Sequence, residues 1–352
     1  MKYQPFDPVA ISPGALAALF DRLSRTASEN GAPDYCPLTK ERAAALLSSH
    51  ASDAAGAERI RVVLSAYDGD APGDAAGLIA GNASPGSDIG YVTVLLTDRP
   101  GGEGERIRRE LLRALTERLR AVNPGLRKLR WVFYNPDLLP WRLRDPFSSC
   151  VHPGAPGVMA SDPARETLLD DGWREFAPLT AYVRPLADYE IPEPLTARME
   201  ENAARGLFTE LYDPALHGSF LPLLDALGSA DWRRAVLGNA ESERPLPMMI
   251  AADRSPETLE KNGGRGFVCG FAGPLRREEN GRGYFAGIGI HSDYRSRGLG
   301  SCLFAALCRG LKSVGADYMT LFTGTDGTAS RIYEKAGFTP AARFSAMEKT
   351  LY

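Results

Sequence analysis

Short apolar runs and one long amphipathic stripe follow each other in the first half of the chain. The runs are broken by Gly, Pro and Asp, which predicts neighbouring strands over 61–67, 76–80 and 91–96. Apolar residues then recur at helical spacing, which predicts a helix with one face formed by Ile107, Leu111, Leu115, Leu119 and Val122. Pro124-Gly125 ends this helix, and a further strand is predicted over 129–134.

The second half repeats this order of elements. Strands are predicted over 248–252, 266–272 and 284–290. A helix follows with Leu299, Leu303, Leu307 and Leu311 spaced four residues apart, and the next strand is predicted over 318–322. We therefore expect a mixed α/β fold, with a mixed sheet, in which one strand–turn–helix–strand unit occurs twice.

Two matching segments set the register of this repeat. The pattern Arg-x-x-Gly-x-Gly at Arg99 recurs at Arg295, 196 residues later, whereas the segment from Ala164 recurs at Ala329, 165 residues later. The difference of 31 residues between the offsets predicts an insertion in the first half, near 135–161. It is either a lid or interface arm, or a packed surface loop. Two domains are expected, over 1–188 and 189–352.

Composition and charge exclude several classes of protein. The 352 residues are 44% hydrophobic, and 41 Lys and Arg against 44 Asp and Glu give a net charge of -3, so nucleic acid is not an expected partner. No apolar run approaches the roughly 18 residues of a membrane span, and no secretory leader is seen, so no membrane partner is expected. Five scattered cysteines are typical of a reducing cytoplasm, and four isolated histidines predict no metal site.

A glycine-rich turn before the second-half helix carries the first chemical signal. Free N–H groups and the dipole at a helix start bind anions, and glycines let the backbone approach a pyrophosphate closely. The turn Arg295-Ser-Arg-Gly298-Leu-Gly300 offers both features together with two arginines. A second signal follows at 326–338, where a short predicted helix ends at Gly337.

Together these segments resemble the GNAT superfamily of acyl-CoA-dependent N-acyltransferases. The resemblance rests on Arg295-x-x-Gly298-x-Gly300 followed by Ala329-x-x-x-Tyr333-Glu-Lys-x-Gly337-Phe338, and the weaker first copy suggests a tandem GNAT protein. It implies that acetyl-CoA is the acyl donor and that Tyr333 protonates the departing thiolate. The residues that it implies for acetyl-CoA binding are Ile288, Ile290, Arg295, Ser296, Arg297, Gly298, Leu299, Gly300, Ser301, Asp326 and Ala329. Relatives commonly carry Asn where Asp326 stands.

The first half keeps the turn but lacks the tyrosine. Arg99, Gly102 and Gly104 form a second candidate CoA site, whereas the counterpart of Tyr333 is Leu168, which donates no proton. The first half therefore binds CoA without turning it over, or it binds nothing and supports the second half.

The acceptor and the general base are less defined. The resemblance places Tyr212 and His217 beside the acceptor pocket, although capping or surface roles suit both. Residues 284–290 contain no carboxylate, so ordered water or a backbone carbonyl is expected to take the amine proton, and His291 is an alternative. We expect direct acetyl transfer to a primary amine of a small molecule or peptide, by a monomer or homodimer. The alternatives are a non-catalytic acyl-CoA-binding or regulatory protein, another acyl donor, and an O or S acceptor.

Overall fold

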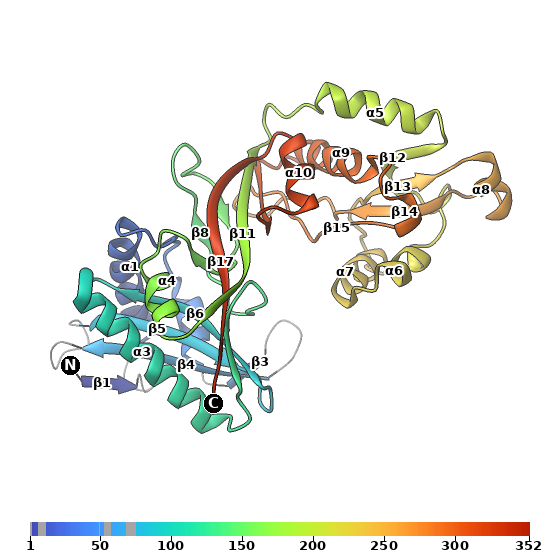
Figure 1. Ribbon diagram of the computed structural model, residues 1–352. Helices are drawn as coiled ribbons and strands as arrows, with labels where there is room; N and C mark the ends of the chain where they lie inside the picture. Colours follow the sequence, from blue (N-terminus) through green and yellow to red (C-terminus); the bar gives the residue numbers. More distant parts are fainter. Residues whose placement is uncertain (1, 6–11, 49, 53–57, 68–74) are drawn as a thin grey trace. The chain divides into compact units, whose positions relative to one another are not determined.

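The computed structural model describes residues 2–5, 12–48, 50–52, 58–67 and 75–352 (Figure 1). By compactness the chain divides into a first unit, Met1–Ala181 with Ala341–Tyr352, and a second unit, Tyr182–Pro340. The second unit thus begins near the predicted boundary at 188, but the last twelve residues of the chain belong to the first unit. The predicted mixed α/β class is confirmed.

The first unit is built on one large sheet. Its helices are α1 (Pro13–Glu29), α2 (Lys40–Leu47), α3 (Gly101–Val122) and α4 (Ala164–Asp170). Its strands are β1 (Lys2–Pro5), β2 (Asp34–Tyr35), β3 (His50–Ser52), β4 (Glu58–Tyr67), β5 (Ala75–Ala83), β6 (Ile89–Thr97), β7 (Lys128–Trp131), β8 (Trp141–Arg142), β9 (Val151–His152), β10 (Val158–Met159) and β11 (Arg174–Pro185), which ends in the second unit. The order β1-β4-β5-β6-β7 is antiparallel except for the parallel pair β6–β7.

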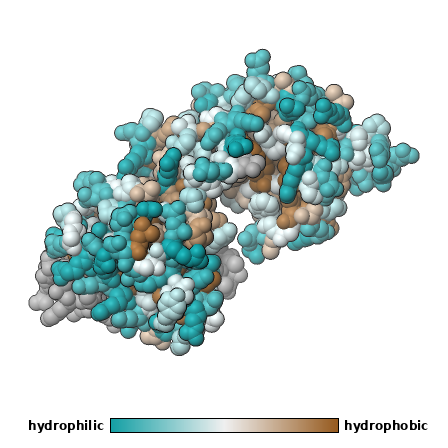
Figure 2. Space-filling model, in the orientation of Figure 1, coloured by the Kyte–Doolittle hydropathy of each residue, from teal (hydrophilic) through white to brown (hydrophobic). Residues whose placement is uncertain are grey.

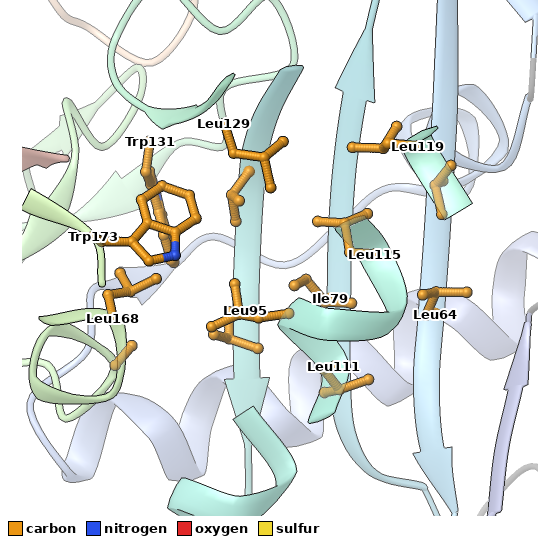
Figure 3. Close-up of a cluster of buried hydrophobic side chains, with 14 of the residues drawn as sticks. Leu64, Ile79, Leu95, Leu111, Leu115, Leu119, Leu129, Trp131, Leu168 and Trp173 are labelled. Atoms are coloured by element: carbon orange, nitrogen blue, oxygen red, sulfur yellow. The ribbon is translucent and has the colours of Figure 1, made fainter. Parts of the chain in front are cut away.

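The predicted apolar stripe of α3 packs on this sheet. Leu111, Leu115 and Leu119 are completely buried and lie against the strands. Figure 3 shows them beside Leu64 of β4 and Ile79 of β5. Burial of an apolar face, rather than intrinsic propensity, holds a surface helix of this kind in place.

The second unit has a smaller sheet of its own. Its helices are α5 (Glu193–Ala203), α6 (Leu221–Leu227), α7 (Ala230–Ala240), α8 (Pro256–Lys261), α9 (Leu299–Ser313) and α10 (Thr328–Lys335). Its strands are β12 (Leu207–Leu211), β13 (Met249–Asp253), β14 (Phe267–Ala272), β15 (Ile288–Ile290), β16 (Tyr318–Gly324) and the start of β17 (Thr339–Thr350). The first four form an antiparallel sheet in the order β12-β13-β14-β15.

The strand predicted over 284–290 is shorter than expected. Only Ile288–Ile290 pair with β14, because the backbone leaves the strand conformation at Gly287, where φ is 142°. A side chain at this position would meet the Trp232 ring, since a Cβ there would lie 2.3 Å from Trp232 Nε1. The glycine thus bends the chain around a tryptophan of α7 just before β15 begins.

The insertion predicted near 135–161 is packed into the first unit. It contains β8, β9 and β10, and Trp141 is 1% exposed and lies edge-on to Phe344, with ring centroids 5.3 Å apart. This is the arrangement that the packed-loop interpretation expects rather than that of a lid. Most of the surface in Figure 2 is hydrophilic, and none of the described helices is long and apolar enough to cross a membrane.

The C-terminal strand completes the core of the first unit. In β17, Met347 pairs with Trp131 of β7 and is fully buried in the same cluster as Leu119 and Leu168. The core of the first unit therefore includes side chains from the end of the chain.

We predict that Met347→Ala destabilises the first unit by about 2–5 kcal/mol, because it leaves a cavity in that core. Hydrogen exchange should show loss of protection in 58–67 and 89–131 and little change in 193–313. The exposed Val314→Ala, in the second unit, is the control. Loss of protection confined to 193–313 would contradict this assignment of the last strand.

Candidate functional site

The start of α9 has the geometry of an anion-binding loop. Ser296 and Gly298 both have left-handed backbone conformations, with φ of 63° and 76°, and Gly298 is the N-cap residue of the helix. When left-handed residues alternate with right-handed ones, successive backbone N–H groups turn toward one point. The N–H groups of Leu299, Gly300 and Ser301 have no acceptor within the helix. A positive φ at a serine is strained, and strain of this kind is concentrated at functional sites.

The charges around this loop favour an anion. Arg295 Nε donates to Ile290 O at 3.2 Å, and the Arg297 guanidinium donates to Asp293 O at 3.1 Å. Neither arginine forms an ion pair with any carboxylate of the described residues, so both positive charges are available. The first turn of α9 contains no acidic residue. The dipole of the helix adds further positive charge at this end.

Gly300 has room around it. A Cβ at this position would lie 3.4 Å from Ile332 Cδ1 and 3.8 Å from Ile290 Cγ1, which are ordinary van der Waals distances. Packing within the protein therefore does not require glycine here. These distances also bring three elements to one point: the start of α9, the end of β15, and α10 at the residue before Tyr333.

β15 presents an open edge to this point. It is the last strand of the four-stranded sheet, and its described residues pair with β14 only, through Ile288–Ala272 and Ile290–Gly270. Upstream, a parallel bridge joins Arg282 to Tyr318 at the start of β16. Since β15 and β16 form no ladder beyond that bridge, the backbone groups of β15 on this edge can bind an extended ligand.

Tyr333 lies in an aromatic core beside this edge. It is 5% exposed, and its ring is 4.7 Å from Phe304 and 6.4 Å from Phe285, measured between centroids. Burial alone raises the pKa of the Tyr333 hydroxyl to about 12. The phenol is therefore fully protonated at neutral pH and is able to donate its proton.

A second tyrosine, which sequence patterns did not indicate, contacts α10. The Tyr182 hydroxyl donates to Glu334 Oε1 at 3.0 Å, and its ring lies 6.2 Å from that of Tyr333. Tyr182 and Glu334 are 152 residues apart, so no local pattern could reveal the contact. Of the other residues expected at the site, Asp326 is exposed in the turn after β16, and Ala329 is half-buried in the first turn of α10.

Both ring nitrogens of His217 are engaged within the protein. His217 is 1% exposed; its Nδ1 accepts from the Asp213 N–H at 3.0 Å, so its Nε2 carries the hydrogen toward Glu210 Oε1, also at 3.0 Å. Tyr212 stacks on His217 and Phe220. These contacts are structural, and a role of either residue toward the acceptor stays a prediction. His291 Nδ1 accepts from the Asp293 N–H at 3.3 Å and caps the 3₁₀ turn Ser292–Tyr294.

The corresponding turn of the first unit has different chemistry. α3 begins at Gly101 and α9 at Leu299, so the helix starts are 198 residues apart and Gly102, not Gly104, corresponds to Gly300. Three residues separate β6 from α3, whereas eight separate β15 from α9, so no single offset holds across both turns. Arg99 Nε lies 3.7 Å from Asp98 Oδ1 and 3.6 Å from Glu103 Oε1.

The two glycines of this turn differ in the space around them. A Cβ at Gly104 would lie 2.1 Å from Arg99 O, so close packing within the protein requires that glycine. Gly102 has open space around its Cβ position, but Glu103 beside it places a negative charge in the first turn of α3. These features do not favour an anion, and CoA binding at Arg99, Gly102 and Gly104 stays a prediction.

In the first unit, a side chain of the same unit binds β6 where its pairing with β7 ends. β6 pairs with β7 only up to Tyr91, and beyond this point the Asn135 amide donates to Val92 O at 3.1 Å and to Thr93 Oγ1 at 3.0 Å. Asn135 opens the insertion and is 3% exposed. Its side chain occupies backbone groups of the strand that corresponds to β15.

Leu168 of the first unit occupies the position that corresponds to Tyr333 of the second. Trp173 N–H donates to Leu168 O, as Phe338 N–H donates to Tyr333 O, and the glycine before each donor has φ near 81°. The offset of 165 is therefore correct. Figure 3 shows Leu168 among Trp131, Trp173 and Leu95, where it contributes to packing alone.

No group of three or more His, Cys, Asp or Glu residues suited to a metal ion is found in the part of the chain that the structure describes. Burial raises the pKa of the Cys302 thiol to about 11 and that of Cys269 to about 12, so neither is an activated nucleophile.

A family model matches part of the second unit. Residues 258–340 match the family model of the acetyltransferase (GNAT) domain. Among curated proteins, no sequence matches the chain.

Solved structures match over almost the whole chain. One is the GCN5-related glucosamine N-acetyltransferase region of a fungal multi-domain GH3 β-N-acetylglucosaminidase, with a TM-score of 0.62 and 15% identity; the match covers 99% of this chain and 38% of that one. A GCN5-related N-acetyltransferase from Sphaerobacter thermophilus has a TM-score of 0.57 and 14% identity. The match covers 99% of this chain and 95% of that one.

A tandem GNAT protein from the clavulanic acid biosynthesis pathway has a TM-score of 0.53 and 13% identity, with 99% and 98% of the two chains covered. At these identities the likeness establishes the fold. The chain therefore has the fold of a tandem GNAT protein, and its segment 258–340 matches the model of the acetyltransferase (GNAT) domain.

Proposed function

We propose that the chain is an acetyl-CoA-dependent N-acetyltransferase with one catalytic centre, in the second unit. The observation that carries this proposal is the meeting of three elements at Gly300. Ile290 of β15 and Ile332, the neighbour of Tyr333, both lie within 4 Å of the Cβ position of Gly300. An anion-binding helix start, an open strand edge and a buried proton donor thus converge.

Acetyl-CoA would bind along these three features. The N–H groups of α9 and the loop from Arg295 would hold the pyrophosphate, and the edge of β15 at Ile288 and Ile290 would hold the pantetheine arm. A backbone N–H of this edge would polarise the thioester carbonyl by donating to the oxygen on which negative charge develops.

The transfer forms one bond and breaks another. The amine nitrogen attacks the thioester carbonyl carbon, the C–N bond forms, and the C–S bond then breaks with the electron pair remaining on sulfur. The Tyr333 hydroxyl gives its proton to that sulfur, and solvent restores it. A thiolate released in this buried core is a stronger base than in water, because burial disfavours its charged form. The proton lost by the amine passes to ordered water or a backbone carbonyl.

Two alternatives remain open to experiment. A non-catalytic acyl-CoA-binding protein would share the helix start and the strand edge, but it has no need of a proton donor at position 333. Another acyl donor, or an O or S acceptor, would use the same machinery, and turnover assays with varied donors and acceptors separate these reactions. The relatives' names support amine acceptors, since two of the three are described as N-acetyltransferases.

We predict that Tyr333→Phe lowers kcat by about 10²–10⁴-fold and leaves the Kd for acetyl-CoA unchanged, because it removes only the proton donor. Assays of CoA release with a panel of amines measure kcat, and calorimetry with acetyl-CoA measures the Kd. Tyr182→Phe is the matched control, since it removes a neighbouring buried hydroxyl that bonds to Glu334 instead. Equal turnover of wild type and Tyr333→Phe would remove Tyr333 from the mechanism.

We also predict the pH dependence of kcat. A phenol donates its proton only below its pKa, and burial moves that pKa from the ordinary value of about 10 to about 12. The rate should therefore rise or stay level between pH 8 and 10.5, as the acceptor amine loses its proton. A basic limb with a midpoint near 10 that disappears in Tyr333→Phe would contradict the raised pKa.

A further inference from the structure

A pocket of the second unit lies beside the segment that leads into β15. Its volume is about 330 Å³. It is bounded by α7, by the segment between α7 and β13, and by the connection between β14 and β15. The lining residues are Ala235, Gly238, Asn239, Ser242, Arg244, Leu246, Pro274, Arg276 and Tyr284.

The pocket is lined by two arginines and by no carboxylate. Arg276 is fixed by the Tyr284 ring, whose centroid lies 3.9 Å from the guanidinium carbon. Neither Arg244 nor Arg276 forms an ion pair with any acidic side chain among the described residues. The face of a guanidinium that stacks on an aromatic ring leaves its N–H edge free for a bidentate anion.

The Asn239 and Ser242 side chains of the pocket are already engaged. The Asn239 amide bonds to both backbone groups of Leu246, donating at 2.9 Å and accepting at 3.0 Å. The Ser242 hydroxyl donates to Asn239 O at 2.9 Å. The C-terminal end of α7 contributes about half a negative charge, which two guanidinium groups outweigh. The pocket therefore has a net positive charge and free donors.

The pocket also lies toward the reacting end of the ligand. The pyrophosphate loop follows the C-terminal end of β15, so a pantetheine arm that runs along the strand places its thioester toward Ile288 and the residues before it. Phe285 packs on Tyr333 with ring centroids 6.4 Å apart, and Tyr284, the next residue upstream, lines the pocket. The adjacent residues Tyr284 and Phe285 thus link the pocket to the aromatic core around Tyr333.

We propose that the acceptor carries an anionic group, a carboxylate or a phosphate, in addition to its amine, and that Arg244 and Arg276 bind this group. This inference rests on the proposed acetyltransferase function and names the class of its acceptor. A polycationic amine is disfavoured, because no acidic residue lines the pocket and two positive charges would repel it.

Matched pairs of acceptors test the inference. The probes are α-amino acids with their amides, and aminoalkyl phosphates with the corresponding aminoalcohols. We expect kcat/KM to be at least about tenfold higher for the anionic member of each productive pair, the effect of one charge-assisted hydrogen bond. The two kinds of pair distinguish carboxylate from phosphate.

Variants assign the preference to the two arginines. In Arg244→Gln/Arg276→Gln the ratio of kcat/KM within a pair should fall to about 1. Arg234→Gln removes a charge from an exposed position of α7 that does not line the pocket, and it should keep the wild-type ratio. Urea unfolding of each variant checks that the fold is kept.

Two results would overturn the inference while leaving the proposed function in place. One is turnover with an anionic preference that the double variant keeps, and the other is turnover that favours polycationic amines. Failure of the proposed function is recognised differently, since acetyl-CoA would then bind without transfer to any amine of either kind, and both proposals would be wrong.

Discussion

Unpaired backbone N–H groups at the start of α9 are the constraint on which the site depends. Four N–H groups at any helix start lack partners within the helix, and most proteins satisfy them with a capping side chain. Here the N-cap is Gly298, with no side chain to offer, and Ser296 is held in a strained conformation before it. The strained serine and the free N–H groups together suit a bound anion.

The two halves share elements but differ in what fills the gap between their central strands. In the first, Asn135 bonds to the backbone of β6, Glu103 lies in the first turn of α3, and Leu168 packs where Tyr333 stands in the second. Each change adds internal contacts and removes a group that a ligand would use. These differences support the proposal that the catalytic centre lies in the second unit alone. The last strand of the chain lies in the core of the first unit.

Sequence periodicity predicted the long elements well because their burial pattern is local. The stripe of α3 and the glycine caps of α4 and α10 needed only neighbouring residues, and the offset of 165 followed from them. The shortened strand before β15 depended on Trp232 meeting Gly287, 55 residues away, and the filling of the first gap depended on one amide of the insertion. Such contacts join residues that lie far apart in the sequence, so no local pattern predicts them. The same holds for the two arginines that line the pocket.

Calorimetric titration of the full chain with acetyl-CoA tests the central claim most directly, namely that one unit binds and the other does not. We expect a stoichiometry of one, with affinity reduced at least about tenfold by Gly300→Ala and unchanged by Gly102→Ala, its counterpart in α3. Both glycines have room for a Cβ within the protein, so neither variant should unfold it. A stoichiometry of two, or equal effects of the two variants, would contradict the account.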